Sequence, residues 1–187
     1  MVARYTRIAM LFHWLVAAMI VANVALALTW DFYPDALVRP AIDTHKSIGV
    51  TVLGLAIMRL LWRFTHRPPP LPPHHKRWER RLAHGVHWLL YILLFAIPLT
   101  GWIMDSAWEK APEVPMIWFG LFEWPRIPMV LALDPATKLA WHDCFGEVHE
   151  NLGVILYVLV ALHLAGAIKH QWFDRDRTIA RMMPGRG

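Results

Sequence analysis

The sequence has little charge and almost no cysteine. Only 18% of its 187 residues are charged, whereas 57% are apolar. Soluble chains average about 25% charged and about 45 to 50% apolar residues. A single globular core of this length could not bury such an excess, which excludes an ordinary soluble domain. Cys144 is the one cysteine, which excludes an intrachain disulfide framework and a four-cysteine zinc or iron-sulfur site.

The apolar residues are gathered in four blocks, each long enough to cross a bilayer. A helix needs about 20 apolar residues to span the hydrocarbon core, and we predict spans at about 8–28, 44–62, 82–104 and 147–168. The second span holds Lys46 and Arg59 near its two ends, where long side chains can reach the interface. The blocks predict an all-α membrane protein, one domain over residues 1–187 folded as an antiparallel four-transmembrane-helix bundle.

Two longer segments separate these spans. Residues 63–81 include a proline-rich run at 68–73, which predicts a stiff polyproline connector. Residues 105–141 are rich in proline and tryptophan, which suits a loop lying at the membrane interface.

The basic residues predict the orientation of the bundle. Of the 19 Lys and Arg residues, two precede the first span, six lie in the 63–81 connector and five follow residue 168. The loops at 29–44 and 105–138 hold eight acidic and only four basic residues. By the positive-inside rule, we expect the connector and both termini to face the cytoplasm and the 105–141 loop to lie on the opposite side of the membrane. This distribution explains the net charge of +5 without a nucleic-acid partner.

Four of the eleven histidines lie at matched depths in the predicted spans. His149 and His163 are 14 residues apart, so they share a helix face about 21 Å apart along the axis. His13 lies about as deep as His163, while His45 opens its span at the same surface as His149. Imidazoles that face each other across a bundle can supply the two axial ligands of a haem iron, so the pattern favours two haems.

We call the level of His13 and His163 the inner layer and the level of His45 and His149 the outer layer. The choice of ligands in the inner layer stays open at this point. His87 begins the third span at about the depth of His13 and His163, so depth cannot select two of the three. A zinc site is the alternative at the outer layer, where Glu147, His149 and Glu150 are close in sequence.

Three histidines of the connector, His66, His74 and His75, are expected to be solvated. His170 continues the His163 face into the inner interface.

Several short motifs resemble the small bacterial cytochrome b561 family over nearly the whole chain. They are Phe12-His13-Trp14, His45-Lys46-Ser47-Ile48-Gly49, His87, and the pair His149 and His163 before Arg181-Met182-Met183-Pro184. The resemblance implies a multi-pass protein of the bacterial inner membrane that contacts lipid and carries two haems b. It assigns the inner haem to His13 and His163 and the outer haem to His45 and His149. The related cytochrome b subunits of membrane formate dehydrogenases and hydrogenases share this arrangement and place a quinone beside the inner haem. By this resemblance, His87, His170 and Arg59 are candidates for quinone contact or proton delivery.

Within the family, the motifs are similar to those of superoxide oxidases, which implies electron transfer from periplasmic superoxide to ubiquinone. The outer ligand of that branch lies in Trp-His-Glu, whereas this chain has Val148-His149-Glu150, and Trp141-His142-Asp143 lies seven residues earlier. His149 keeps the 14-residue spacing and His142 does not.

Superoxide is an anion, so its entry requires a local positive charge. Lys46, next to His45, is the first candidate for steering it, and the others are Arg39, Lys110, Arg126 and Lys138. Two alternatives remain. One is an electron-transfer subunit that links another donor or dehydrogenase to the quinone pool, and the other is a haem-free transporter that uses the histidines as metal ligands. The sequence indicates no particular protein partner.

Overall fold

Four long helices dominate the computed structural model, which describes residues 4–70 and 75–183. They are α1 (Arg7–Thr29), α2 (Asp35–Thr65), α3 (Arg77–Ala107) and α5 (Pro135–Ile168). Within the described residues, these four helices are long and apolar enough to cross a membrane. The mostly helical fold with four candidate spans agrees with the class predicted from the sequence.

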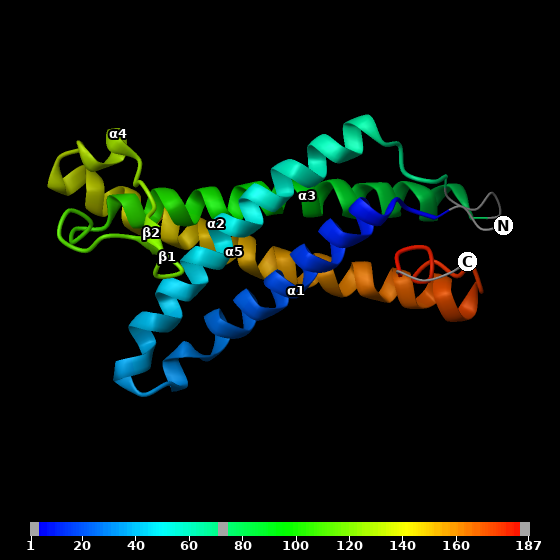
Figure 1. Cartoon of the computed structure of the whole chain (residues 1–187), viewed down its shortest axis with the longest axis horizontal. Helices are drawn as coiled ribbons and strands as arrows, with labels where there is room; N and C mark the ends of the chain where they lie inside the picture. The colour runs from blue at the N-terminus through cyan, green and yellow to red at the C-terminus, as the bar shows by residue number, and fades with distance from the viewer. Residues whose placement is uncertain (1–3, 71–74, 184–187) are drawn as a thin grey trace.

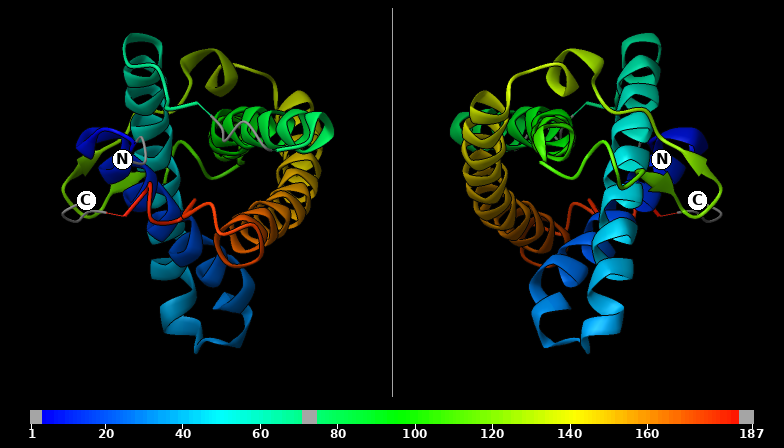
Figure 2. Two further views of the ribbon diagram at one scale, coloured as in Figure 1. Left: turned by 90° about the vertical axis from the view of Figure 1, so that its right-hand side faces the viewer. Right: turned by 90° about the vertical axis from the view of Figure 1, so that its left-hand side faces the viewer.

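The helices form two crossed pairs (Figures 1 and 2). Helix α1 packs on α2 and α3 packs on α5, while α2 contacts α3 and joins the two pairs. Consecutive long helices run in opposite directions, and the start of α1 lies at the same end of the molecule as the end of α5 (Figure 1). The opposite end, which we call the loop end, carries the segment between α3 and α5.

Helices α2 and α5 begin well before the predicted spans. Helix α2 starts at Asp35 instead of residue 44, and α5 starts at Pro135 instead of residue 147. The Asp134 carboxylate caps α5 by accepting hydrogen bonds from the backbone N–H groups of Ala136 and Thr137, both at 3.1 Å. Pro135 fits the first turn because a helix leaves the N–H groups there without intrahelical partners.

The segment between α3 and α5 is therefore shorter than the loop 105–141 that the sequence predicts. It contains the antiparallel strands β1 (Ile117–Trp118) and β2 (Phe122–Glu123) and the short helix α4 (Pro128–Leu131). The connection between α1 and α2 contains one short 3-10 helix, η1 (Trp30–Phe32).

The polyproline prediction for the connector falls partly on 71–74, which lie outside the described residues, as does the expectation for His74. Pro68 to Pro70 have no regular secondary structure.

Apolar side chains lie both inside the bundle and on its outer surface. Val16, Val52 and Leu94 belong to a buried cluster between α1, α2 and α3. Leu11 and Val21 are exposed on α1, although they are as apolar as the core. Such a distribution is expected where lipid, and not water, surrounds the helices.

Candidate functional site

His45 of α2 and His149 of α5 face each other near the loop end. Their ring centroids are 6.1 Å apart, and the ring planes make an angle of 72°. Each Nδ1 lies near a backbone carbonyl oxygen, His45 at 3.3 Å from Asn23 and His149 at 3.0 Å from Ile97. A carbonyl only accepts hydrogen bonds, so each Nδ1 carries the ring proton. Each Nε2 is then the nitrogen with a lone pair available for a metal.

Helix α3 sets the position of the His149 ring. A Cβ atom at Gly101 would lie 3.1 Å from Cε1 and 3.2 Å from Nδ1 of His149. The Thr100 hydroxyl is 3.3 Å from the same Nδ1. The imidazole therefore packs directly on the backbone of α3, at a position that accepts only glycine without displacement of the ring.

A second imidazole pair lies nearer the chain ends. His13 of α1 and His163 of α5 have ring centroids 6.1 Å apart and planes at 71°. The inner layer also brings together two other predicted residues. The His87 ring centroid is 5.2 Å from that of His163, and Arg59 Nη2 is 3.2 Å from His13 Nδ1.

Hydrogen bonds distinguish the inner rings from the outer ones. A guanidinium only donates, so His13 Nδ1 accepts from Arg59. His87 Nδ1 lies 2.5 Å from the Ala83 carbonyl oxygen and therefore donates to it, which leaves Nε2 of His87 as the acceptor nitrogen.

The spacing of the two pairs fits a metal bound between them. If metal–nitrogen bonds are about 2 Å long and each ring nitrogen is about 1.1 Å from its ring centre, two imidazoles that held one metal between them would have centroids roughly 6.3 Å apart. Both pairs lie at 6.1 Å, whereas His87 and His163 are nearly 1 Å closer than that. The donor set of two neutral nitrogens at each level is that of a bis-histidine haem.

Lys46 occupies a charged cluster at the loop end. Its Nζ forms an ion pair with Asp105 Oδ1, and Arg126 Nε donates to the other Asp105 oxygen at 2.9 Å. The Lys46 side chain is 16% exposed and that of Asp105 only 4%. Two cations share one carboxylate, so these three residues carry one net positive charge next to His45. Asp105 lies in α3 and is buried, whereas the sequence pattern predicts that a loop begins at this residue.

The other predicted steering residues are more dispersed. Arg39 pairs with Asp43 at 2.9 Å, on an exposed part of α2. Its Cζ also lies 5.3 Å from the centroid of the Trp108 ring. Lys110 is exposed and Lys138 is half-buried.

His142 is not part of either pair, because its Nδ1 lies 3.0 Å from the Met104 carbonyl oxygen of α3. Among the described residues, Glu147, His149 and Glu150 do not converge into a compact metal-binding group.

His170 and His75 lie together, apart from the inner pair. His170 belongs to the π-helical segment η2 (Lys169–Phe173), and its ring stacks on that of His75 with centroids 4.3 Å apart. His170 is seven residues beyond His163, which is about 10 Å along a helix axis. The expectation that His75 is solvated is wrong, because His75 is only 7% exposed. His66 is exposed as expected and stacks on Trp62.

Comparison with known proteins gives relatives over nearly the full length of the chain. Residues 4–185 match the family described as prokaryotic cytochrome b561. "Cytochrome b561 homolog 2" of Escherichia coli (strain K12) is 34% identical over 183 residues, which are 96% of this chain and 91% of that protein. "Probable superoxide oxidase CybB" of Yersinia pestis is 24% identical over 172 residues, 92% of this chain and 91% of that protein. "Cytochrome b561 homolog 1" of Escherichia coli (strain K12) is 24% identical over 188 residues, 98% of each chain. With the four helices and their facing histidines, these matches show that the chain belongs to the prokaryotic cytochrome b561 family.

Proposed function

We propose that this bacterial membrane electron-transfer protein binds two haems b and passes electrons from superoxide to ubiquinone. Its family implies haem b. The observation that carries the proposal is the pair of facing imidazoles at each of two depths, both with ring centroids 6.1 Å apart. We assign His45 and His149 to the outer haem and His13 and His163 to the inner haem.

The protein's own task at each haem is to fix its ligands. When bound, haem iron accepts and releases single electrons. The Asn23 and Ile97 carbonyl oxygens hold the outer rings in one tautomer and one orientation, as the outer hydrogen bonds of metal-bound histidines commonly do.

At the inner layer, Arg59 changes its hydrogen-bond partner when His13 binds the haem iron, and this change connects haem binding with quinone binding. For His13 to bind iron through Nε2, its ring proton must move to Nδ1, so the Arg59 guanidinium must leave Nδ1. We propose that Arg59 then donates hydrogen bonds to a quinone carbonyl oxygen. Formation of a quinol from a quinone consumes two electrons and two protons, and we propose that Nε2 of His87, whose Nδ1 donates to Ala83, takes up and releases these protons. Because His170 lies with His75, we leave it outside this quinone site.

Two observations support superoxide as the electron donor. The first is the net positive charge of Lys46, Arg126 and Asp105 beside the outer pair, since a local positive potential attracts an anion. The second is the name of the Yersinia pestis relative. The excess of Lys and Arg in the connector and near both termini supports a periplasmic loop end and a cytoplasmic quinone side.

The test is to mix superoxide rapidly with the purified, ubiquinone-loaded protein while following haem absorbance. We expect reduction of haem faster than spontaneous dismutation of superoxide, followed by quinol formation. A red protein that superoxide does not reduce would reject superoxide as the donor and favour an electron-transfer subunit with another donor. A colourless protein after haem-sufficient expression would reject the haem assignment itself.

Variants that remove one positive charge test whether Lys46 attracts superoxide to the outer haem. We expect Lys46→Gln to slow haem reduction by superoxide and to weaken its dependence on ionic strength. Lys110→Gln is the matched control, because it removes the same charge from an exposed site at the same end. Equal rates for both variants at low ionic strength would contradict a steering role for Lys46.

A further inference from the structure

Four potential metal ligands from distant parts of the chain meet at the end that carries both termini. His75 precedes α3, His170 lies in η2, and Asp174 and Asp176 follow η2. One ligand atom from each of the four lies within 4.8 Å of the other three. His75 and Asp176 are 101 residues apart in the sequence, so this convergence is produced by the fold alone.

We propose that His75, His170, Asp174 and Asp176 bind a divalent transition-metal ion of the zinc class. Such a site goes beyond the proposed electron transfer and shares no residue with the haem or quinone sites described above.

The donor chemistry selects this class of ion. Imidazole nitrogens suit Zn²⁺ and its first-row neighbours, whereas Ca²⁺ and Mg²⁺ prefer a shell of oxygen ligands. Two neutral imidazoles and two carboxylates also balance the charge of a divalent cation, which lowers the cost of placing it in a partly buried site. Tetrahedral ligands with bonds of about 2 Å lie roughly 3.3 Å apart. The four ligand atoms, all within 4.8 Å of one another, need only small side-chain movements to reach that geometry.

The present contacts show which protons the metal would replace. His75 Nε2 bonds to Asp176 Oδ2, and His170 Nδ1 lies 2.7 Å from Asp174 Oδ2 and 3.6 Å from Asp176 Oδ2. Each short contact places a proton between an imidazole nitrogen and a carboxylate oxygen. A bound cation would take the place of these protons and hold the same four side chains through coordinate bonds.

Burial and backbone geometry hold the ligands in place. The side chains of His75 and Asp176 are 4% and 2% exposed, and those of His170 and Asp174 are 15% and 26% exposed. One side of the group is therefore enclosed, while the other is accessible to an entering ion. The π-helical turn that carries His170 is a rare element that occurs often at functional sites.

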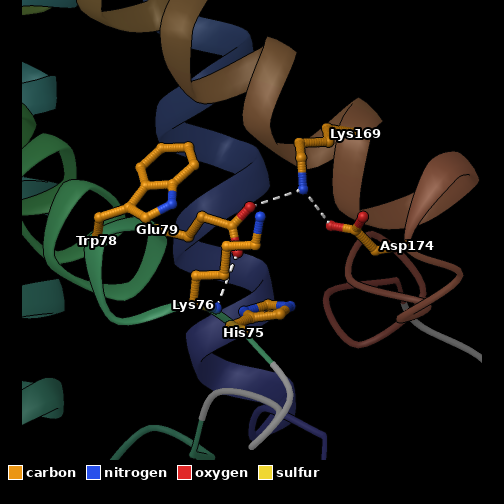
Figure 3. A pocket seen from close by; sticks show the side chains of 6 residues that line it. All are labelled: His75, Lys76, Trp78, Glu79, Lys169 and Asp174. Carbon is orange, nitrogen blue, oxygen red and sulfur yellow. Dashed lines mark hydrogen bonds and ion pairs between the residues drawn. The ribbon is translucent and has the colours of Figure 1, made fainter.

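A pocket of about 430 Å³ gives access to the group, lined in part by His75 and Asp174 (Figure 3). In Figure 3, Lys169 reaches between Glu79 of α3 and Asp174. Its Nζ lies 3.0 Å from Glu79 and 2.6 Å from Asp174. Asp174 can turn to a metal with little loss, because Glu79 remains to pair with Lys169.

The experiment uses the haem-loaded full chain in detergent. The protein is stripped with a chelator, incubated with Zn²⁺ and desalted, and its zinc content and affinity are then measured by mass spectrometry and by competition with a chromophoric chelator. We expect one retained Zn²⁺ per chain. His75→Gln and Asp174→Asn should each weaken binding at least about tenfold. The exposed His84 on the same end provides the control His84→Gln, which should bind as the unchanged chain does.

Absorption spectroscopy at the zinc edge gives a readout that needs no variant. We expect nitrogen and oxygen ligands at about 2.0 Å, with the outer scattering of two imidazoles and no sulfur. Failure of the unchanged chain to retain stoichiometric zinc would overturn the proposal. Sulfur ligation, or unaltered affinity in folded His75→Gln and Asp174→Asn variants, would overturn it as well.

Discussion

The two imidazole pairs have the same geometry but different surroundings. Their centroid distances are identical, and their interplanar angles differ by only one degree. Around the outer pair, each Nδ1 meets a backbone carbonyl oxygen. Around the inner pair, the Arg59 guanidinium donates to His13 and a third histidine, His87, contacts His163. The spacing of the rings is thus set by helix packing, while the hydrogen-bond partners around each pair set which ring nitrogen carries the proton.

These different surroundings suit different roles for the two layers. Backbone carbonyls fix the outer rings and cannot exchange protons, which suits a site that only relays electrons. The inner layer has a guanidinium and a third imidazole, those of Arg59 and His87, next to the proposed ligands. That combination suits the side at which electrons and protons combine on a quinone.

Removal of a single proposed haem ligand should have the largest effect, which is the loss of one haem while the other is retained. We expect His163→Ala to reduce the haem content from two per chain to about one by loss of the inner haem, because His163 is the imidazole that faces His13 at 6.1 Å. His149→Ala should remove the outer haem instead. Haem content per chain and redox titration distinguish the two outcomes. His142→Ala is the control, and a full complement of haem in His163→Ala would contradict the assignment.

Replacement of Gly101 should damage only the outer layer. In Gly101→Val, side-chain atoms would overlap the His149 ring, since even a Cβ atom would lie 3.1 Å from Cε1. We expect loss of most of the outer haem, with the inner haem retained. Gly85→Ala on the same helix is the matched control, because a Cβ there meets nothing within 4 Å. Equal haem loss at both layers would show that α3 has been disrupted as a whole.

Removal of the Arg59 charge should alter the inner haem without releasing it. A nearby cation stabilises the reduced, more electron-rich state, so we expect Arg59→Gln to lower the midpoint potential of the inner haem only. Potentiometric titration followed by visible absorption measures both haems. Arg59→Lys, which keeps the charge, should restore most of the potential. A shift of the outer potential by the same amount would argue against a local effect.

The cap of α5 should have the smallest effect. The Thr137 hydroxyl and two backbone N–H groups donate to Asp134 and hold the pKa of this carboxyl below its ordinary value. Because the folded-state pKa is depressed, the stabilisation is present above the unfolded pKa and is lost as pH falls through the folded pKa. We expect Asp134→Ala to lower the melting temperature slightly at neutral pH and to remove this acid dependence, whereas Asp134→Asn retains the cap. Thermal unfolding measured from neutral to acidic pH tests both statements.

Local sequence signals predicted much of the helical architecture. The four apolar blocks predicted the four candidate spans, because the thickness of the hydrocarbon core fixes the length of a spanning helix. The start of α5 could also have been read from Asp134-Pro135, a strong capping signal that the hydrophobic pattern obscured. Likewise, Pro34-Asp35 marks the start of α2, where polar residues in the first turns hid the helix.

The two levels of histidines also followed from the sequence alone, because residues 14 apart on a helix have a fixed separation along its axis. His149 and His163 therefore had to occupy two depths on one face. Only the tertiary structure showed that His13 and not His87 lies at the wider spacing from His163, since that distance depends on how α1 and α3 pack around α5. For the same reason, the burial of Asp105 between two cations and the meeting of His75 with Asp176 could not be predicted. Helical periodicity relates residues within one helix, whereas contacts between distant segments arise only when the helices pack.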